Sequence, residues 1–332
     1  MNDGEPGQLF SSQAVRRIAP QSLEQHIRKL HRGMTVTNGH HESLVVGYVN
    51  DLEWNFFDEI HRIYVHHTYS DMMKVFSGRD FSVNVVKWGG LPLFVQVANA
   101  KIDTGLFYQA MVIMGIIYCH QITKLTQQSD KVLITVDWFT ASHWMFRPLH
   151  YWFNRRLLKL QRVQDAEDNE NIRGRRFALR KSGVSFSTDH PDFLNSNVLS
   201  DNLRFPTTGS PWRRSIRDIP YDSLQRLKVG PVDLTIERRQ SGDIKVWPAV
   251  CPHEGAELCP DKMNASGMIQ CPWHGRQFRG VRLASEQGSL SLGNARVTLV
   301  DTDLVLTIVG DEALSGVGLS RTAPMGSPLD AR

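Results

Sequence analysis

Two short segments near the C-terminus carry side chains of the types that bind transition metals. The first, "CPHEG", holds Cys251 and His253, and the second, "CPWHG", holds Cys271 and His274 after seventeen intervening residues. Each segment offers one thiolate and one imidazole, and the four ligands suit either a tetrahedral zinc ion or an iron–sulfur cluster. Structural zinc sites favour like pairs within a segment, such as Cys-x-x-Cys. The mixed pairs in this chain therefore favour an iron–sulfur cluster.

The residues around these ligands, "CPHEGAEL" and "CPWHGRQF", closely resemble the two loops of the Rieske [2Fe-2S] motif. The resemblance implies that Cys251 and Cys271 hold one iron and that His253 and His274 hold the other. Neutral imidazoles in place of thiolates raise the reduction potential relative to a cluster bound by cysteines alone. Trp273 stands where Rieske proteins of respiratory chains have a disulfide-forming cysteine, so the cluster resembles the lower-potential kind found in ferredoxins and oxygenases.

A second set of candidate ligands lies in "NFFDEIHRIYVHH", where Asp58, His61 and His66 follow an Asp-x-x-His-x-x-x-x-His spacing. Two imidazoles and a carboxylate leave positions open on a ferrous ion for oxygen and substrate. Asp58 and His61 share one face of a predicted helix, but His61 and His66 lie about 140° apart around an ideal helix. Both histidines can face one metal only where the helix bends, ends or contains a π-bulge. His67 is the alternative to His66.

The third ligand is expected from another part of the chain. The segment "VQDAEDNENIR" offers Asp165 and Asp168, three residues apart on a predicted helix. Together, "NFFDEIHRIYVHHT" and "AEDNENI" resemble the iron-binding segments of Rieske non-haem iron oxygenases, a ring-hydroxylating type of oxygenase. The resemblance implies a mononuclear Fe(II) bound by His61, His66 and Asp168.

In this family an aspartate links the two metal centres, and Asp58 matches it. The resemblance implies that Asp58 pairs with His61 of its own subunit and with His274 of the partner subunit, in a head-to-tail homotrimer. Two features depart from the family pattern. The Rieske segment follows the catalytic segment instead of preceding it, and Trp54 stands where many members have glutamate. The family's subunit interface and linker are therefore not carried over to this chain.

The elements that position these residues form two domains. Residues 52–76 predict a helix, four segments between residues 80 and 139 have strand character, and residues 150–174 predict a long closing helix. This α+β plan resembles the helix-grip (START-like) fold with its antiparallel sheet. Short strands separated by turn signals predict a small all-β domain near the C-terminus. The predicted boundaries are an N-terminal helical arm at 1–45, a catalytic domain at 46–186, a connector at 187–228, a Rieske domain at 229–310 and a flexible tail at 311–332.

Composition limits the broad class of protein. A length of 332 residues favours two domains, and a net charge of +4 gives no indication of nucleic-acid binding. The most apolar run, residues 105–119, is too short to span a membrane and predicts one buried strand. The first residues show no secretory signal, and four cysteines without a disulfide pattern indicate a reducing compartment. We therefore expect a cytoplasmic protein without a membrane span.

The resemblance implies an oxygenase that uses O₂ and externally supplied electrons to hydroxylate, demethylate or similarly oxidise a small organic substrate. The chain shows no glycine-rich nucleotide loop after a strand, so we expect a ferredoxin or flavin reductase as electron donor. One alternative is an electron-transfer protein with a non-catalytic, ligand-binding helix-grip domain. Another is a redox-sensing interaction module, with the basic run "RGRRFALRK" (173–181) as a partner surface. The sequence identifies neither the substrate nor the choice between mono- and dioxygenation.

Overall fold

The computed structural model describes residues 22–59, 61–66, 69–88, 94–169, 173–187, 201–207, 209–241, 243–284 and 287–309. The chain divides into two compact units, each described here by itself. The first unit comprises Met1–Glu167 and Asp192–Ser196, and the second comprises Asp168–Pro191 and Asn197–Arg332. Several sequence predictions lie outside the described residues: His67, the first part of the arm, the middle of the connector and the tail.

An antiparallel sheet of seven strands forms the first unit, in the order β1-β7-β6-β5-β4-β3-β2. Consecutive strands from β2 to β7 pair as neighbours, and β1 pairs with β7 along its whole length. One face of the sheet is buried more deeply than the other, because buried and less buried side chains alternate along β4 and most of β7. The strands are β1 Thr35–Val46, β2 Tyr69–Ser77, β3 Phe81–Trp88, β4 Phe94–Asp103, β5 Leu106–Ile113, β6 Ile117–Gln128 and β7 Lys131–Ser142.

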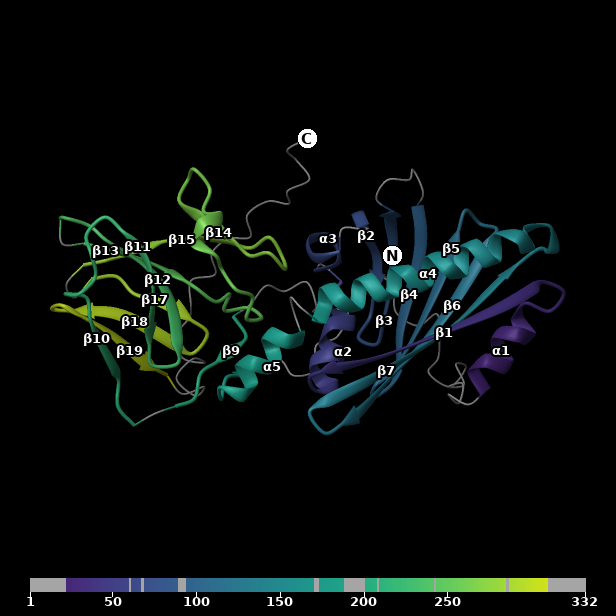
Figure 1. Ribbon diagram of the computed structural model, residues 1–332, viewed down its shortest axis with the longest axis horizontal. Coiled ribbons are helices and arrows are strands. Elements are labelled where there is room, and N and C mark those ends of the chain that lie inside the picture. The colour runs from purple at the N-terminus through teal and green to yellow at the C-terminus, as the bar shows by residue number, and fades with distance from the viewer. Residues whose placement is uncertain are drawn as a thin grey trace, which may run out of the picture. The chain divides into compact units, whose positions relative to one another are not determined.

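Helices cover both faces of this sheet. Trp138 of β7 belongs to the same core as Phe153 and Leu157 of the long helix α4, whereas its neighbour Phe139 packs with Leu23 of α1. Successive side chains of a strand point to opposite faces, so α4 and α1 lie on opposite sides of the sheet. Figure 1 shows α4 crossing the sheet. The helices are α1 Leu23–Leu30, α2 Val49–Phe57, α3 His61–Val65, the short 3₁₀ helix η2 Trp144–Phe146 and α4 Arg147–Asp168.

This arrangement confirms the predicted α+β class and the helix-grip plan, with differences in detail. The single helix predicted over residues 52–76 is wrong: α2 ends at Phe57, α3 has five residues, and Tyr69–Ser77 is strand β2. β2 pairs with β3 through Phe76 and Met72, and this pairing overrides the helical pattern of the segment. None of the helices in the described residues is long and apolar enough to cross a membrane.

Two further segments differ from the sequence-based expectation. Residues 35–45, expected in the arm, form most of β1 and are hydrogen-bonded to β7 as an edge strand. The apolar run 105–119, expected as one strand, forms β5 and the start of β6, joined by a tight turn. Met114 and Gly115 in this turn have φ of +53° and +69°, and glycine adopts such values without a Cβ clash.

The second unit is a small β domain preceded by helix α5. Two four-stranded antiparallel sheets, β10-β19-β18-β17 and β11-β12-β13-β16, enclose a core that includes Leu234, Val246 and Leu306. Part of the predicted connector belongs to this unit, because β9, β10 and β11 lie within residues 203–229. The elements are α5 Gly174–Lys181, β8 Ser185–Phe186, β9 Leu203–Arg204, β10 Trp212–Ser215, β11 Leu224–Val229, β12 Val232–Arg238, β13 Ile244–Pro248, η4 Pro260–Lys262, β14 Met268–Gln270, β15 Gln277–Arg279, β16 Val281–Leu283, β17 Leu290–Leu292, β18 Ala295–Val300 and β19 Asp303–Ile308.

Candidate metal centres

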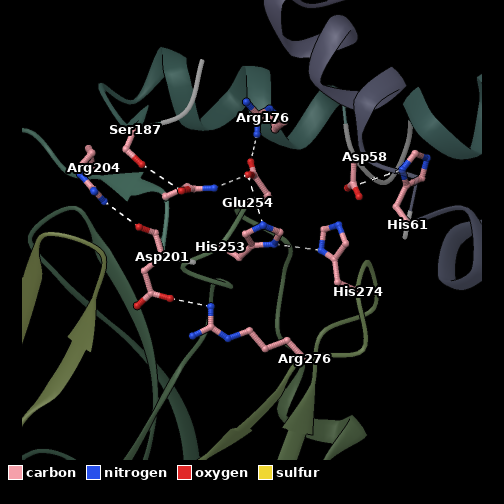
Figure 2. Close-up of polar contacts among 11 residues, drawn as sticks. Asp58, His61, Arg176, Ser187, Asp201, Arg204, His253, Glu254, His274 and Arg276 are labelled. Atoms are coloured by element: carbon pink, nitrogen blue, oxygen red, sulfur yellow. Dashed lines mark hydrogen bonds and ion pairs between the residues drawn. The ribbon is translucent and has the colours of Figure 1, made fainter. Parts of the chain in front are cut away.

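Two loops of the second unit bring the four predicted cluster ligands together. The first loop follows β13, and the second connects β14 to β15. His253 and His274 meet with their Nδ1 atoms 3.3 Å apart and their ring centroids 4.7 Å apart (Figure 2). Cys251 and Cys271 are both buried, as are the two histidines. The paired imidazole nitrogens and paired thiols match the donor set of a cluster in which each iron takes one pair.

The two loops repeat one backbone pattern. In each, the cysteine N–H donates to the carbonyl five residues later, and the N–H of the closing glycine donates back to the carbonyl of the cysteine. Both glycines have positive φ, +86° and +68°, where a side chain is disfavoured. The donor and acceptor pairs are Cys251 to Ala256 (2.8 Å), Gly255 to Cys251 (2.8 Å), Cys271 to Arg276 (2.7 Å) and Gly275 to Cys271 (3.0 Å).

The pKa values of the two cysteine thiols are shifted in opposite directions. A hydrogen bond with Cys251 lowers the pKa of Cys271 to about 5, whereas burial raises the pKa of Cys251 well above its ordinary value. Metal binding requires both cysteines as thiolates and therefore releases the protons that they carry.

A second group of metal-binding side chains includes two histidines of the first unit. His61, His66 and Asp168 are buried, and each offers a ligand atom within 4.8 Å of the other two. Asp168 is the last residue of α4 and directly follows Glu167 of the same helix. Two imidazoles and one carboxylate form the donor set that ferrous iron takes with open positions for further ligands. The residues therefore fit a mononuclear iron.

A break in the helix allows the two histidines to converge. α2 ends at Phe57, Asp58 has the non-helical ψ of +86°, and α3 begins at His61. α3 ends at Val65, so His66 stands just beyond the helix instead of about 140° around it. The shared helix face predicted for Asp58 and His61 is wrong, yet Asp58 Oδ2 lies 3.7 Å from His61 Nδ1 across the break (Figure 2).

The acidic residues near the end of α4 have different hydrogen-bond partners. Glu167 Oε2 accepts a hydrogen bond from His66 Nδ1 at 2.9 Å, which leaves Nε2 of that imidazole as the metal-binding atom. Asp165, the predicted alternative to Asp168, instead accepts hydrogen bonds from His41 Nε2 at 3.0 Å and Ser43 Oγ at 2.9 Å. Asp165 is therefore engaged with β1.

The sequence profile of the Rieske [2Fe-2S] domain matches residues 213–307, a range that includes both ligand loops. This range is a Rieske [2Fe-2S] domain. The prediction of a C-terminal Rieske domain is confirmed, and the domain supports a [2Fe-2S] cluster and an electron-transfer or oxygenase role. An electron-transfer partner is implied with it.

A curated relative gives a shorter match. The chain is 32% identical over 77 residues to cholesterol 7-desaturase of Xenopus laevis, which covers 23% of this chain and 17% of that protein. The match therefore spans well under two thirds of the relative. It agrees with an oxidoreductase role for the Rieske domain.

Solved structures resemble part of the chain at low sequence identity. Norcoclaurine synthase from Thalictrum flavum is 13% identical with a TM-score of 0.31, covering 35% of this chain and 82% of that one. Zhui aromatase/cyclase from Streptomyces sp. R1128 is 10% identical with a TM-score of 0.30, covering 33% and 70%. A hypothetical protein, jhp0584, from Helicobacter pylori is 11% identical with a TM-score of 0.34, covering 40% and 86%.

A buried ion pair supports the first ligand loop of the Rieske domain. The carboxylate of Glu254, next to His253, accepts hydrogen bonds from the Arg176 guanidinium and from Asn202 Nδ2, the latter at 2.8 Å (Figure 2). Arg176 is fully buried, and its guanidinium lies 3.8 Å from the centre of the Phe186 ring. The basic run 173–181 is therefore more than a solvated face, because one of its arginines holds the cluster loop.

Sequence reasoning missed this network for a specific reason. Arg176 and Glu254 are 78 residues apart, and neither lies in a repeated or periodic pattern that pairs them. The available signal was the charged residue itself, since a glutamate between a ligand histidine and the closing glycine of a buried loop requires a partner.

Gly255→Ala is expected to destabilise the first ligand loop. A Cβ at this position would lie 2.3 Å from Leu179 Cδ1, a clash that the Leu179 side chain has to relieve by repacking between α5 and the loop. Gly183→Ala is the matched control, because Gly183 has nearly the same φ, +85°, but its Cβ would meet Pro206 at an ordinary 3.7 Å. We expect Gly255→Ala to lower the free energy of unfolding by about 1–3 kcal/mol more than the control does. Denaturant unfolding, monitored through the absorbance of the cluster, measures this difference. Equal losses would contradict the close packing of α5 on the loop.

Glu167→Ala is expected to weaken ferrous iron binding by about 10–100-fold, because it removes the acceptor that orients His66. A competition titration with a ferrous chelator measures this change on the Rieske-loaded protein. Asp165→Ala removes a carboxylate from the same helix whose partners are His41 and Ser43, and it should leave iron affinity near that of the unaltered protein. The role of Glu167 would be refuted by equal affinities in the two variants.

Proposed function

We propose that this protein is a Rieske-type non-haem iron oxygenase that uses O₂ and externally supplied electrons to oxidise a small organic substrate. The observation that carries the proposal is the buried group of His61, His66 and Asp168, in a chain that also has a Rieske domain. A Rieske cluster without a second metal site would account for electron transfer and nothing more. A second donor set with one carboxylate and two imidazoles provides a place for oxygen chemistry.

The proposed ligands follow from the donor types. Cys251, Cys271, His253 and His274 would hold the [2Fe-2S] cluster, and His61, His66 and Asp168 would hold Fe(II). When bound, the cluster supplies single electrons and the ferrous ion supplies the site of O₂ activation. For a hydroxylation, one O₂, two electrons and two protons yield the hydroxylated substrate and one water.

The protein's own side chains keep this site dry and oriented. Glu167 holds the Nδ1 proton of His66, and Asp58 lies beside Nδ1 of His61 without exposure to solvent. Arg173 donates a hydrogen bond to Asp168 Oδ2 at 3.3 Å, which orients the carboxylate. Exclusion of water from such a site prevents loss of reactive species to solvent.

The inner face of the first unit's sheet offers hydrogen-bonding groups to a substrate. Ser82, Asn99, Gln109 and Gln121 are direct cross-strand neighbours on β3 to β6. Gln109 Nε2 donates to Asn99 Oδ1 at 2.6 Å. A small cavity beside this row is lined by the amides of Asn99, Gln109 and Gln121, by Thr123 and by the aromatic residues Phe56, Phe107 and Tyr108. The cavity itself has room for about one water molecule, so these residues would supply polar contacts to a substrate without forming its whole pocket.

The partners and the finer chemistry are part of the proposal. A ferredoxin or flavin reductase would supply the electrons, and a head-to-tail trimer would place Asp58 against the cluster histidine His274 of the partner subunit. The relative's name, cholesterol 7-desaturase, supports desaturation as one reaction type beside hydroxylation and demethylation.

A single-turnover experiment tests the proposal. Rieske-loaded protein is reduced without oxygen, divided into samples with and without added ferrous iron, and mixed with oxygenated buffer. The proposal predicts that ferrous iron accelerates cluster oxidation and that product forms with a suitable substrate. An unchanged oxidation rate would favour the alternative, a Rieske electron-transfer protein with a non-catalytic ligand-binding domain.

A further inference from the structure

One end of the first unit's sheet exposes large apolar side chains from three separate segments. Thr35 pairs with Ser142 and Tyr118 pairs with Ala141, so the start of β1, the β5–β6 turn and the residues after β7 meet at this end. Six large side chains at this end of the sheet form a surface that we call the aromatic end. They are between 40% and 74% exposed: Met34, Met114, Trp144, Met145, Tyr151 and Trp152.

The aromatic end is not needed to hold α4 on the sheet. Phe153 and Leu157 anchor the helix in the core, and the buried His150 bonds to Ser142 and Thr37 on the sheet side. Tyr151 and Trp152 face away from this contact. An exposed group of large apolar side chains on a folded domain marks an interaction site.

The charged residues around the aromatic end are mostly basic. From Ser142 to Gln164 there is no aspartate or glutamate, whereas Arg147, Arg155, Arg156, Lys159 and Arg162 are all cationic and exposed. In the second segment, Lys29 and Arg32 are basic and residues 25–41 contain no acid, whereas Arg28 is paired with Glu24. The acids of α4 begin at Asp165, near the end of the helix that carries Asp168. Trp152 and Asp168 are about 24 Å apart along the helix axis, so the aromatic end is separate from the group of His61, His66 and Asp168.

Exposed tryptophan and tyrosine beside arginine is the combination found where proteins lie on a lipid bilayer. The amphipathic rings of Trp and Tyr settle at the level of the headgroups, and arginine pairs with anionic phosphate and carboxylate groups. Each basic residue near an anionic surface adds attraction that falls off within a Debye length. A protein partner would need a matching acidic and apolar face, whereas an anionic bilayer supplies both features in one surface.

We propose that the aromatic end binds the surface of an anionic phospholipid bilayer. Trp144, Tyr151 and Trp152 enter the headgroup layer, and Arg147, Arg155 and Arg156 lie against the anionic groups. The inference rests on a surface of the first unit and stands independently of the proposed oxygenase activity.

Vesicle sedimentation with full-length, cluster-loaded protein tests this proposal. We expect roughly tenfold more bound protein on vesicles of phosphatidylcholine with phosphatidylserine than on phosphatidylcholine alone, with the difference shrinking as salt is raised. Absence of binding to the mixed vesicles, or equal binding to both kinds, would overturn the proposal.

Paired variants locate the binding surface. Trp144→Ser with Trp152→Ser should reduce the bound fraction roughly tenfold, whereas Phe76→Ser, an equally exposed aromatic on the opposite edge strand β2, should not. Arg155→Glu with Arg156→Glu should abolish the preference for phosphatidylserine, and Arg213→Glu with Arg214→Glu in the Rieske domain should keep it. Circular dichroism and cluster absorbance together check that both units of each variant are folded.

Light scattering on the same samples separates the bilayer from a second copy of the chain. If the tryptophan variant lowers the oligomer mass and neither protein binds vesicles, the aromatic end is an interface between copies and the proposal is wrong. An unchanged oligomer mass together with lost vesicle binding supports it.

Discussion

Replacing His61 with alanine is expected to remove ferrous iron and abolish O₂-dependent oxidation while the Rieske cluster remains. His61 is one of three donors in the buried group, and its loss leaves one imidazole and one carboxylate for the metal. The effect on iron affinity should exceed the roughly 10–100-fold that loss of an outer hydrogen-bond partner costs. The cluster loops lie in a separate unit, so visible cluster absorbance should match that of the unaltered protein.

The matched control for this change is His41→Ala. His41 is a partly buried histidine whose Nε2 is hydrogen-bonded to Asp165 of α4, outside the metal group. His41→Ala should therefore keep both iron binding and oxidation. Iron retained in His61→Ala, or cluster absorbance lost with it, would count against the assignment of the two metal groups.

Asp58→Asn is expected to keep both metals and slow oxidation of the reduced cluster by about 10–100-fold. The substitution preserves size and removes the charge beside His61 Nδ1, at the position proposed to link the two centres. Rapid mixing of reduced, iron-loaded protein with oxygenated buffer measures the rate by cluster absorbance. Asp51→Asn is the control, because Asp51 is also a buried acid but lies in α2, outside the metal group.

A rate in Asp58→Asn equal to that of the unaltered protein would eliminate the bridging role. A loss of iron in Asp58→Asn would show instead that the carboxylate helps to hold His61. The two outcomes are separated by measuring iron content before the kinetic experiment.

The cluster loops were predictable from sequence because each is a local structure. The ligands within a loop are two or three residues apart, and the closing glycines have the positive φ that such turns require. The group of His61, His66 and Asp168 was predictable only by resemblance. Its histidines converge because α3 ends at Val65, and Asp168 joins them at the end of α4, a relation that depends on how the helix packs.

Other features could not be derived from local patterns. The segment around Met72 has helical periodicity but pairs with β3, because tertiary contacts decide the structure of a short ambiguous segment. β1 was hidden because its alternation is weak, with many half-exposed polar residues on an edge strand. The buried pair of Arg176 and Glu254 is a contact between distant segments, and its residue types alone indicate surface positions.

The ratio of iron to acid-labile sulfide per chain tests the central claim most directly. Protein purified without oxygen, supplied with ferrous iron and freed of excess metal should contain roughly three irons for two sulfides, the sum of one [2Fe-2S] cluster and one mononuclear site. His61→Ala should reduce the ratio to roughly two irons for two sulfides. The same two-to-two ratio in the unaltered protein would contradict the oxygenase, and zinc without sulfide would contradict the cluster as well.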